Sequence, residues 1–199
     1  MSQSFAEVIE SSLIIWKAQS WRWDVFPAFG SLITIATPER TVFGLVYQIQ
    51  TGSLDGSRTP FAYQKTEEEL KNQQPQIFEF LQTTFSCLTV GFLEHNKLLY
   101  QLAPEPPKIH AFVSHAPTEE TCQFFSDEQY LHLLFNAGHH IVTLDELLLA
   151  ILKKRSELGL LNQVQIARFI ETFSLLTSND YRRLKLFLQR ARHVINLSA

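Results

Sequence analysis

The sequence predicts an α+β fold in which a small antiparallel β-barrel is followed by an all-helical C-terminal domain. Apolar residues alternate with polar ones through much of the first half, which is typical of half-buried strands. From about residue 117 the apolar spacing becomes that of helices. We therefore expect a barrel domain at residues 1–116, with a helical insertion at about 66–83, and a helical domain at residues 117–199.

Short β-forming segments separated by turn residues define the expected strands. Within residues 43–49 every second residue is apolar, so these side chains are expected on one face. Residues 38–40, which begin with Pro38, are expected to form a hairpin loop, and residues 94–96 a second turn. The other expected strands are residues 12–16, 30–35, 87–93, 97–100 and 109–113.

Capping signals mark the expected helices. Pro75 is expected to begin a short helix over residues 76–83 whose apolar side chains pack on the barrel. Longer helices are expected at residues 144–158, ended by Gly159, and at residues 163–175 and 180–195. Three residue pairs have capping-box spacing: Thr66 with Glu69, Ser126 with Gln129, and Thr143 with Glu146. In the last helix, the residues expected to face inward are Tyr181, Leu184, Phe187, Leu188, Ala191 and Ile195.

The composition is that of a globular protein, with 45% hydrophobic and 19% charged residues among 199. No stretch approaches the roughly 20 apolar residues of a membrane-spanning helix, so we expect no membrane contact. The N-terminus lacks the basic start and apolar run of a signal peptide. Without that signal, Cys87 and Cys122 are expected to be buried thiols in a cytoplasmic protein.

Charge is unevenly distributed along the chain. Residues 1–149 carry 17 acidic and 8 basic side chains, a balance of −9, whereas residues 150–199 carry 3 acidic and 9 basic ones, a balance of +6. A cationic end on an anionic body indicates an interaction surface near the C-terminus.

Two stretches resemble the HAS-barrel, the small β-barrel at the N-terminus of HerA-type DNA-translocating ATPases and of ATP synthase catalytic-head subunits. They are Phe43-Gly44-Leu45-Val46-Tyr47-Gln48-Ile49 and Val90-Gly91-Phe92-Leu93-Glu94-His95-Asn96-Lys97-Leu98-Leu99-Tyr100, which continues into the prolines Pro104, Pro106 and Pro107. The resemblance covers about residues 8–115. It implies a docking role, because such barrels assemble rings and bind partner proteins. A HerA-type ring ATPase or its nuclease partner is the companion that it implies.

The chain departs from that family after the barrel. HerA-type ATPases continue into a nucleotide-binding domain with a Walker A loop, and this sequence contains no Gly-x-x-x-x-Gly-Lys-Ser/Thr. The phosphate cradle and its lysine are missing, so ATPase activity is not implied and no cofactor is expected.

The residues that most often carry catalysis or bind metals have simpler structural interpretations. His139 and His140 are adjacent, and neighbouring helical residues point about 100° apart, so one metal would be poorly coordinated. Cys87 lies between apolar residues, as a buried strand thiol does. Ser31 and Ser53 lack the Gly-x-Ser-x-Gly pattern of a nucleophile elbow. We therefore expect no metal site and no enzyme.

The segment 51–58 is the most site-like part of the barrel. Ser53, Asp55 and Arg58 flank two glycines and are suited to holding a phosphate or the backbone of a partner. The same residues also suit a long hairpin tip in which Asp-Gly supports the turn and Arg58 is solvated, and this interpretation is favoured.

The last helix carries the second candidate surface, a cationic face made of Arg182, Arg183, Lys185, Arg190 and Arg192. Such a face can contact nucleic-acid phosphates or the acidic barrel of another subunit. It can also simply stabilise the helix end and remain solvated. The leading hypothesis is a non-catalytic adaptor or assembly protein that acts by protein–protein contact. The alternative is a nucleic-acid-binding accessory protein, and a homo-oligomer remains open.

Overall fold

The structure is a computed structural model that describes residues 3–55, 57, 60–141 and 143–195. Six antiparallel strands close a barrel in the order β2-β1-β7-β3-β4-β5, and β2 pairs with β5 to complete it. A short seventh strand, β6, forms a hairpin on β5 outside the barrel. The strands are β1 (Ser4–Ser11), β2 (Ile15–Ser20), β3 (Leu32–Ala36), β4 (Arg40–Ser53), β5 (Leu81–Glu94), β6 (Lys97–Leu99) and β7 (Phe112–His115).

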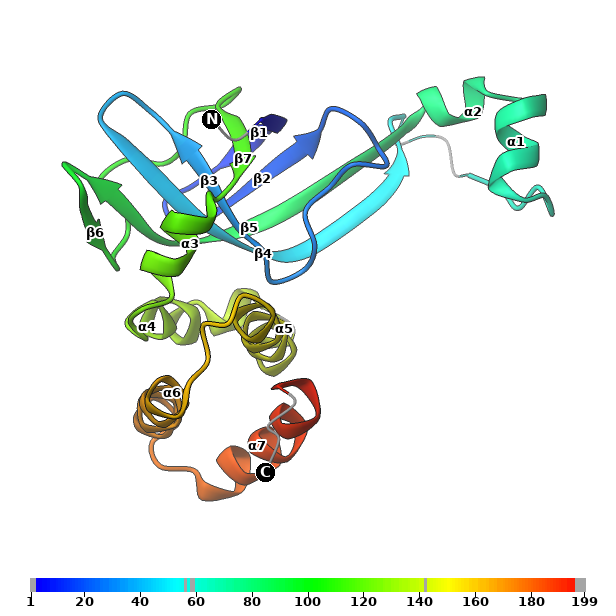
Figure 1. Cartoon of the computed structure of the whole chain (residues 1–199). Helices are drawn as coiled ribbons and strands as arrows, with labels where there is room; N and C mark the ends of the chain where they lie inside the picture. The colour runs from blue at the N-terminus through cyan, green and yellow to red at the C-terminus, as the bar shows by residue number, and fades with distance from the viewer. Residues whose placement is uncertain (1–2, 56, 58–59, 142, 196–199) are drawn as a thin grey trace.

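Helices occupy two places relative to the barrel (Figure 1). α1 (Glu67–Gln73) and α2 (Gln76–Glu79) lie between β4 and β5 at the far end of their ribbon. The C-terminal helices gather on one side of the barrel and are α3 (Thr118–Phe124), α4 (Tyr130–Asn136), α5 (Leu144–Glu157), α6 (Gln163–Leu176) and α7 (Tyr181–Ile195), with a 3-10 turn at Gly138–His140. The expected α+β class, with a barrel, a helical insertion and a helical C-terminal part, is confirmed.

Two hydrophobic clusters explain how barrel and helices hold together. The barrel interior is filled by side chains such as Trp16, Ile33 and Phe85, which are at most 1% exposed. The second cluster joins the outer face of β4 and β5 to the C-terminal helices, so that Phe43 of the barrel and Leu148 of α5 share one core. Burying a large apolar side chain contributes about 1.5–3 kcal/mol, so this shared core fixes the helices on the barrel wall.

A buried ion pair joins α5 to the other C-terminal helices. Arg155 of α5 is fully buried and donates to both carboxylate oxygens of Glu128, at 2.8 and 2.7 Å. It also donates to the Tyr130 hydroxyl and to the Phe125 carbonyl, and its guanidinium lies over the Phe125 ring. A buried pair with this many hydrogen bonds is costly to break. This cluster therefore holds α5 against the α3–α4 connection.

Several expected turns and helix ends are confirmed. Thr37 N donates to Arg40 O and closes the β3–β4 hairpin at the expected Pro38 loop. His95 and Asn96 both have positive φ, as a two-residue hairpin turn between β5 and β6 requires. Gly159, at φ +69, follows the end of α5 and adopts the left-handed conformation that glycine tolerates.

Several strand predictions were wrong. Residues 12–14 form a turn, because the Ser12 hydroxyl accepts from Ile15 N and donates to Ile15 O; strands β1 and β2 lie on either side. The strand expected at residues 109–113 is Phe112–His115. The helix expected over residues 76–83 ends at Glu79, since residues from Leu81 onward pair with β4 as strand β5. The side chains of α2 are not buried on the barrel, although Phe78 stacks on Trp23.

The helical predictions need smaller corrections. The Thr66–Glu69 capping box is present, but Thr143 makes no side-chain cap, and the Ser126 hydroxyl donates to Gln123 O instead. A capping box that the sequence analysis did not identify joins Asn162 and Gln165 at the start of α6. In α7, Tyr181 points outward and is 73% exposed.

Cys87 is buried as expected, whereas Cys122 is only half-buried.

Candidate docking surfaces

The β4–β5 ribbon extends beyond the barrel as a free arm. β2 pairs with β5 only from Thr84 to Leu88, and β3 pairs with β4 only from Thr41 to Leu45. Beyond these points β4 and β5 pair with each other as far as Ser53 and Leu81. We call the described residues of 50–83, with α1 and α2 at their end, the arm; Figure 1 shows it projecting away from the barrel.

The arm is stiffened at its base. The Thr51 and Thr83 hydroxyls lie 2.7 Å apart across the two strands, and Thr83 also donates to the Trp23 carbonyl at 2.5 Å. At the far end Leu54 N donates to Phe80 O at 2.7 Å, so the ribbon pairing continues to the start of the helices. Cross-strand pairs of this kind fix the register of a hairpin. The end of the arm is therefore held at a defined distance from the barrel.

Apolar side chains collect at the end of the arm. Leu54 is 55% exposed and Phe61 is 68% exposed, and the Phe61 ring rests on Tyr63 at a centroid distance of 4.2 Å. A cavity of about 370 Å³ lies beside them, lined by Ser53, Pro60, Phe61, Tyr63, Ile77, Phe80 and Leu81. Contiguous exposed apolar surface is typical of an interaction site, so this end of the arm is the first candidate docking surface.

The polar residues predicted as a site in this region mainly support a local turn. Ser53, the last residue of β4, accepts from Asp55 N at 3.2 Å. The Asp55 carboxylate accepts from the Ser57 hydroxyl at 2.7 Å and from Ser57 N at 2.9 Å, and these bonds hold the pKa of Asp55 below its usual value. Arg58 lies outside the described residues. Ser53 and Asp55 thus adopt the geometry of a hairpin tip.

The cationic face of α7 is divided by α5. Arg183 donates to Asp145 at 2.8 Å and lies over the Phe135 and Phe173 rings, and Arg190 donates to Glu146. Both carboxylates belong to the first turn of α5, where negative charge is favoured by the helix dipole. Arg182, Lys185 and Arg192 are exposed and make no ion pair within the described ranges. Of the five cations predicted to form one face, two are therefore paired with carboxylates of α5 and three are unpaired within the described ranges.

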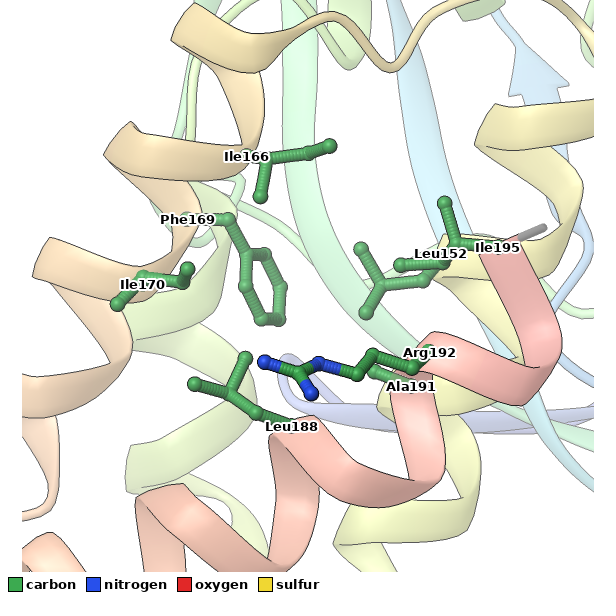
Figure 2. Close-up of a pocket in the computed structure, with 8 residues that line it drawn as sticks. All are labelled: Leu152, Ile166, Phe169, Ile170, Leu188, Ala191, Arg192 and Ile195. Carbon is green, nitrogen blue, oxygen red and sulfur yellow. The ribbon is translucent and has the colours of Figure 1, made fainter. Parts of the chain in front are cut away.

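An apolar cleft between α6 and α7 is lined in part by Arg192, one of these unpaired cations (Figure 2). It has a volume of about 160 Å³ and is open to solvent. Figure 2 shows Ile166, Phe169 and Ile170 of α6 facing Leu188 and Ala191 of α7, with the Arg192 guanidinium extended across the opening. The remaining residues of this α6–α7 cleft are Leu152 and Ile195. Leu188, Ala191 and Ile195 of this set are expected from the sequence to face the core, so the cleft is not predicted by the sequence.

Among the described residues, the histidines and the cysteine considered for chemistry lie in separate parts of the fold. The His139 and His140 rings lie with their centroids 3.8 Å apart and their planes tilted by 45°, and the described residues contain no group of three metal-ligating side chains. Cys87 is enclosed in the barrel, where burial raises the pKa of its thiol and disfavours the thiolate. Burial also raises the pKa of the Tyr130 hydroxyl beside Arg155, which keeps that hydroxyl protonated.

Comparison of the sequence with protein-family models gives no match, and comparison with curated proteins gives no significant match. The closed six-stranded barrel is compatible with the HAS-barrel resemblance at the level of architecture. Within the described part of the chain, no helix is both long and apolar enough to cross a membrane.

Proposed function

We propose that this chain is a non-catalytic adaptor or assembly protein that acts by protein–protein contact, with the arm as its docking element. The observation that carries the proposal is the exposed apolar end of the arm, where Leu54 and Phe61 are more than half exposed on a ribbon that the barrel does not cover. Aromatic side chains of this kind are the usual anchors of protein interfaces. In the buried polar cluster, both terminal nitrogens of Arg155 donate, to the Glu128 carboxylate, the Tyr130 hydroxyl and the Phe125 carbonyl, which supports a structural role for this arginine.

A HerA-type ring ATPase or its nuclease partner is the companion that we propose for this adaptor. Support comes from the resemblance of residues 43–49 and 90–107 to the HAS-barrel, together with a closed barrel formed by the strands that carry those residues. A cytoplasmic location is part of the same proposal.

The test compares partner recovery with two matched variants of the chain. Tagged wild type, Phe61→Asn and Leu175→Asn are purified from native cells, and co-purifying proteins are identified and then titrated in pure form. Phe61 and Leu175 are exposed to nearly the same extent, 68% and 67%, but Leu175 lies on α6 away from the arm. We expect Phe61→Asn to weaken binding at least about tenfold, as loss of an interface anchor does, and Leu175→Asn to bind like wild type.

Equal binding by all three proteins would overturn the arm as the docking element. Recovery of a HerA-type ATPase or its nuclease would support the finer proposal. Arm-dependent recovery of an unrelated protein would support the adaptor function and overturn that companion.

Nucleic-acid binding by α7 is the alternative, supported by the exposed and unpaired Arg182, Lys185 and Arg192. It is weakened by the pairing of Arg183 and Arg190 with carboxylates. If three cations contact phosphates of duplex DNA, the logarithm of affinity should fall with the logarithm of salt with a slope of about −2.7. Gel-shift titration with single-stranded DNA, duplex DNA and RNA checks this, and no shift at low salt would eliminate the alternative.

A further inference from the structure

Two unpartnered features of this one chain are complementary in shape. The α6–α7 cleft has a volume of about 160 Å³ and a mostly aliphatic lining, and an apolar cavity of about 150 Å³ is known to accept one benzene molecule. Phe61, at the end of the arm, is the most exposed phenylalanine among the described residues, at 68%. Its only ring contact there is with Tyr63. The cleft therefore has the size of the side chain that the arm presents.

The two features are also complementary in charge. α1, which follows Phe61 on the arm, begins with Glu67, Glu68 and Glu69. Glu67 pairs with Lys71 and Glu69 caps the helix, whereas Glu68 makes no ion pair within the described ranges. On the other side, Arg192 lines the cleft, and Lys185 lies earlier on the same helix, three residues before the lining residue Leu188. Neither cation makes an ion pair within the described ranges. Opposite charges around an apolar contact fix its orientation and speed its formation.

The arm of one chain cannot fill its own cleft. Figure 1 shows α1 and α2 at the tip of the ribbon that projects to one side of the barrel, whereas α6 and α7 lie below the barrel, apart from that tip. The arm is a hydrogen-bonded ribbon from Thr51 and Thr83 outward, so it does not fold back without losing that pairing. Any contact between the two features is therefore between two molecules.

We propose that the arm of one copy of this chain docks in the α6–α7 cleft of a second copy, with the Phe61 ring in the cleft and the acidic end of α1 facing Lys185 and Arg192. This inference rests on the proposed assembly function and names the second copy as a partner. Because the two contacting surfaces are different, copies can associate in two ways: as a symmetric pair that exchanges arms reciprocally, or head to tail in rings or filaments.

The decisive experiment uses two complementary variants and sedimentation velocity. Phe61→Asp disables the arm and leaves the cleft intact, whereas Arg192→Glu disables the cleft and leaves the arm intact. Both positions are exposed, so both variants are expected to fold. The average molecular mass of the wild type should increase as its concentration is raised roughly hundredfold, because the copies associate. Each variant alone should keep the mass of the monomer. Mixed in equal amounts, the two variants should form a 1:1 dimer, because one intact arm and one intact cleft remain.

Leu175→Asp serves as the matched control, because this exposed residue of α6 does not line the cleft. It should associate like wild type, and added salt should weaken the association. A wild type that stays monomeric, an association that survives both variants, or a mixture that stays monomeric would each overturn the inference. A monomeric wild type that still binds another protein through Phe61 would overturn only the second copy as partner and would leave the proposed function standing.

Discussion

At one end of the β4–β5 ribbon, Phe43 and Val90 are buried between the barrel wall and the helices, whereas at the other end Leu54 and Phe61 are exposed. The two ends belong to the same pair of 14-residue strands. Phe43 packs on Phe124 of α3 at a ring distance of 5.3 Å, whereas the Phe61 ring rests on Tyr63 of the arm. Apolar side chains therefore stabilise the fold at one end of the ribbon, whereas at the other end they are exposed and can contact a partner.

The largest expected difference between the two ends comes from the same substitution made at each. Phe43→Ala should lower the free energy of unfolding by about 3–5 kcal/mol, because it removes a buried ring and leaves a cavity. Phe61→Ala should change it by less than about 0.5 kcal/mol, because the ring is mainly exposed. Urea denaturation at low protein concentration checks both. Similar losses from the two variants would show that the end of the arm belongs to the core.

Two glycines of β4 provide a second, smaller contrast. A Cβ at Gly44 would lie 2.4 Å from the Trp16 ring, and Trp16 is enclosed in the barrel, whereas a Cβ at Gly52 would meet nothing within 4 Å. Gly44→Ala should therefore destabilise the protein by about 1–3 kcal/mol through overpacking. Gly52→Ala should stay within about 0.5 kcal/mol of wild type. Thermal unfolding of the pair measures the difference, and an unaffected Gly44→Ala would mean that Trp16 has room to move.

The sequence allowed the helical half to be predicted more closely than the barrel. α5, α6 and α7 were located to within a residue or two at each end, because apolar stripes and Gly159 are local signals. In the barrel, a β-bulge between Val46 and Gln48 breaks the two-residue alternation, so that Leu45 packs against the helices while Ile49 packs in the barrel interior. Such a bulge depends on strand pairing, and alternation in one strand does not reveal it.

The candidate surfaces depend still more on tertiary contacts. Segment 51–58 was located from its turn residues, but the length of the arm follows from where β2 stops pairing, near Thr84. The cationic residues of α7 were identified from spacing alone. Their division into paired and unpaired groups follows from Asp145 and Glu146, which lie on a different helix. The cleft was not predictable, because an apolar stripe does not show whether a neighbouring helix fills the space beside it.

The smallest expected effect on stability comes from removing most of the arm. Leu54 N donates to Phe80 O, so a two-residue Asn-Gly turn in place of residues 55–79 should connect the strands without changing their register. The shortened chain should be about as stable as wild type, because the closure entropy saved by the shorter loop, about 0.6 kcal/mol per halving, offsets loss of the Phe78 stack on Trp23, worth about 0.5–1.5 kcal/mol. Urea denaturation measures this change, and sedimentation shows whether self-association is lost with the arm. A loss of stability above about 2 kcal/mol would contradict the comparison, because the barrel would then depend on the end of the ribbon that lies beyond its strand pairing.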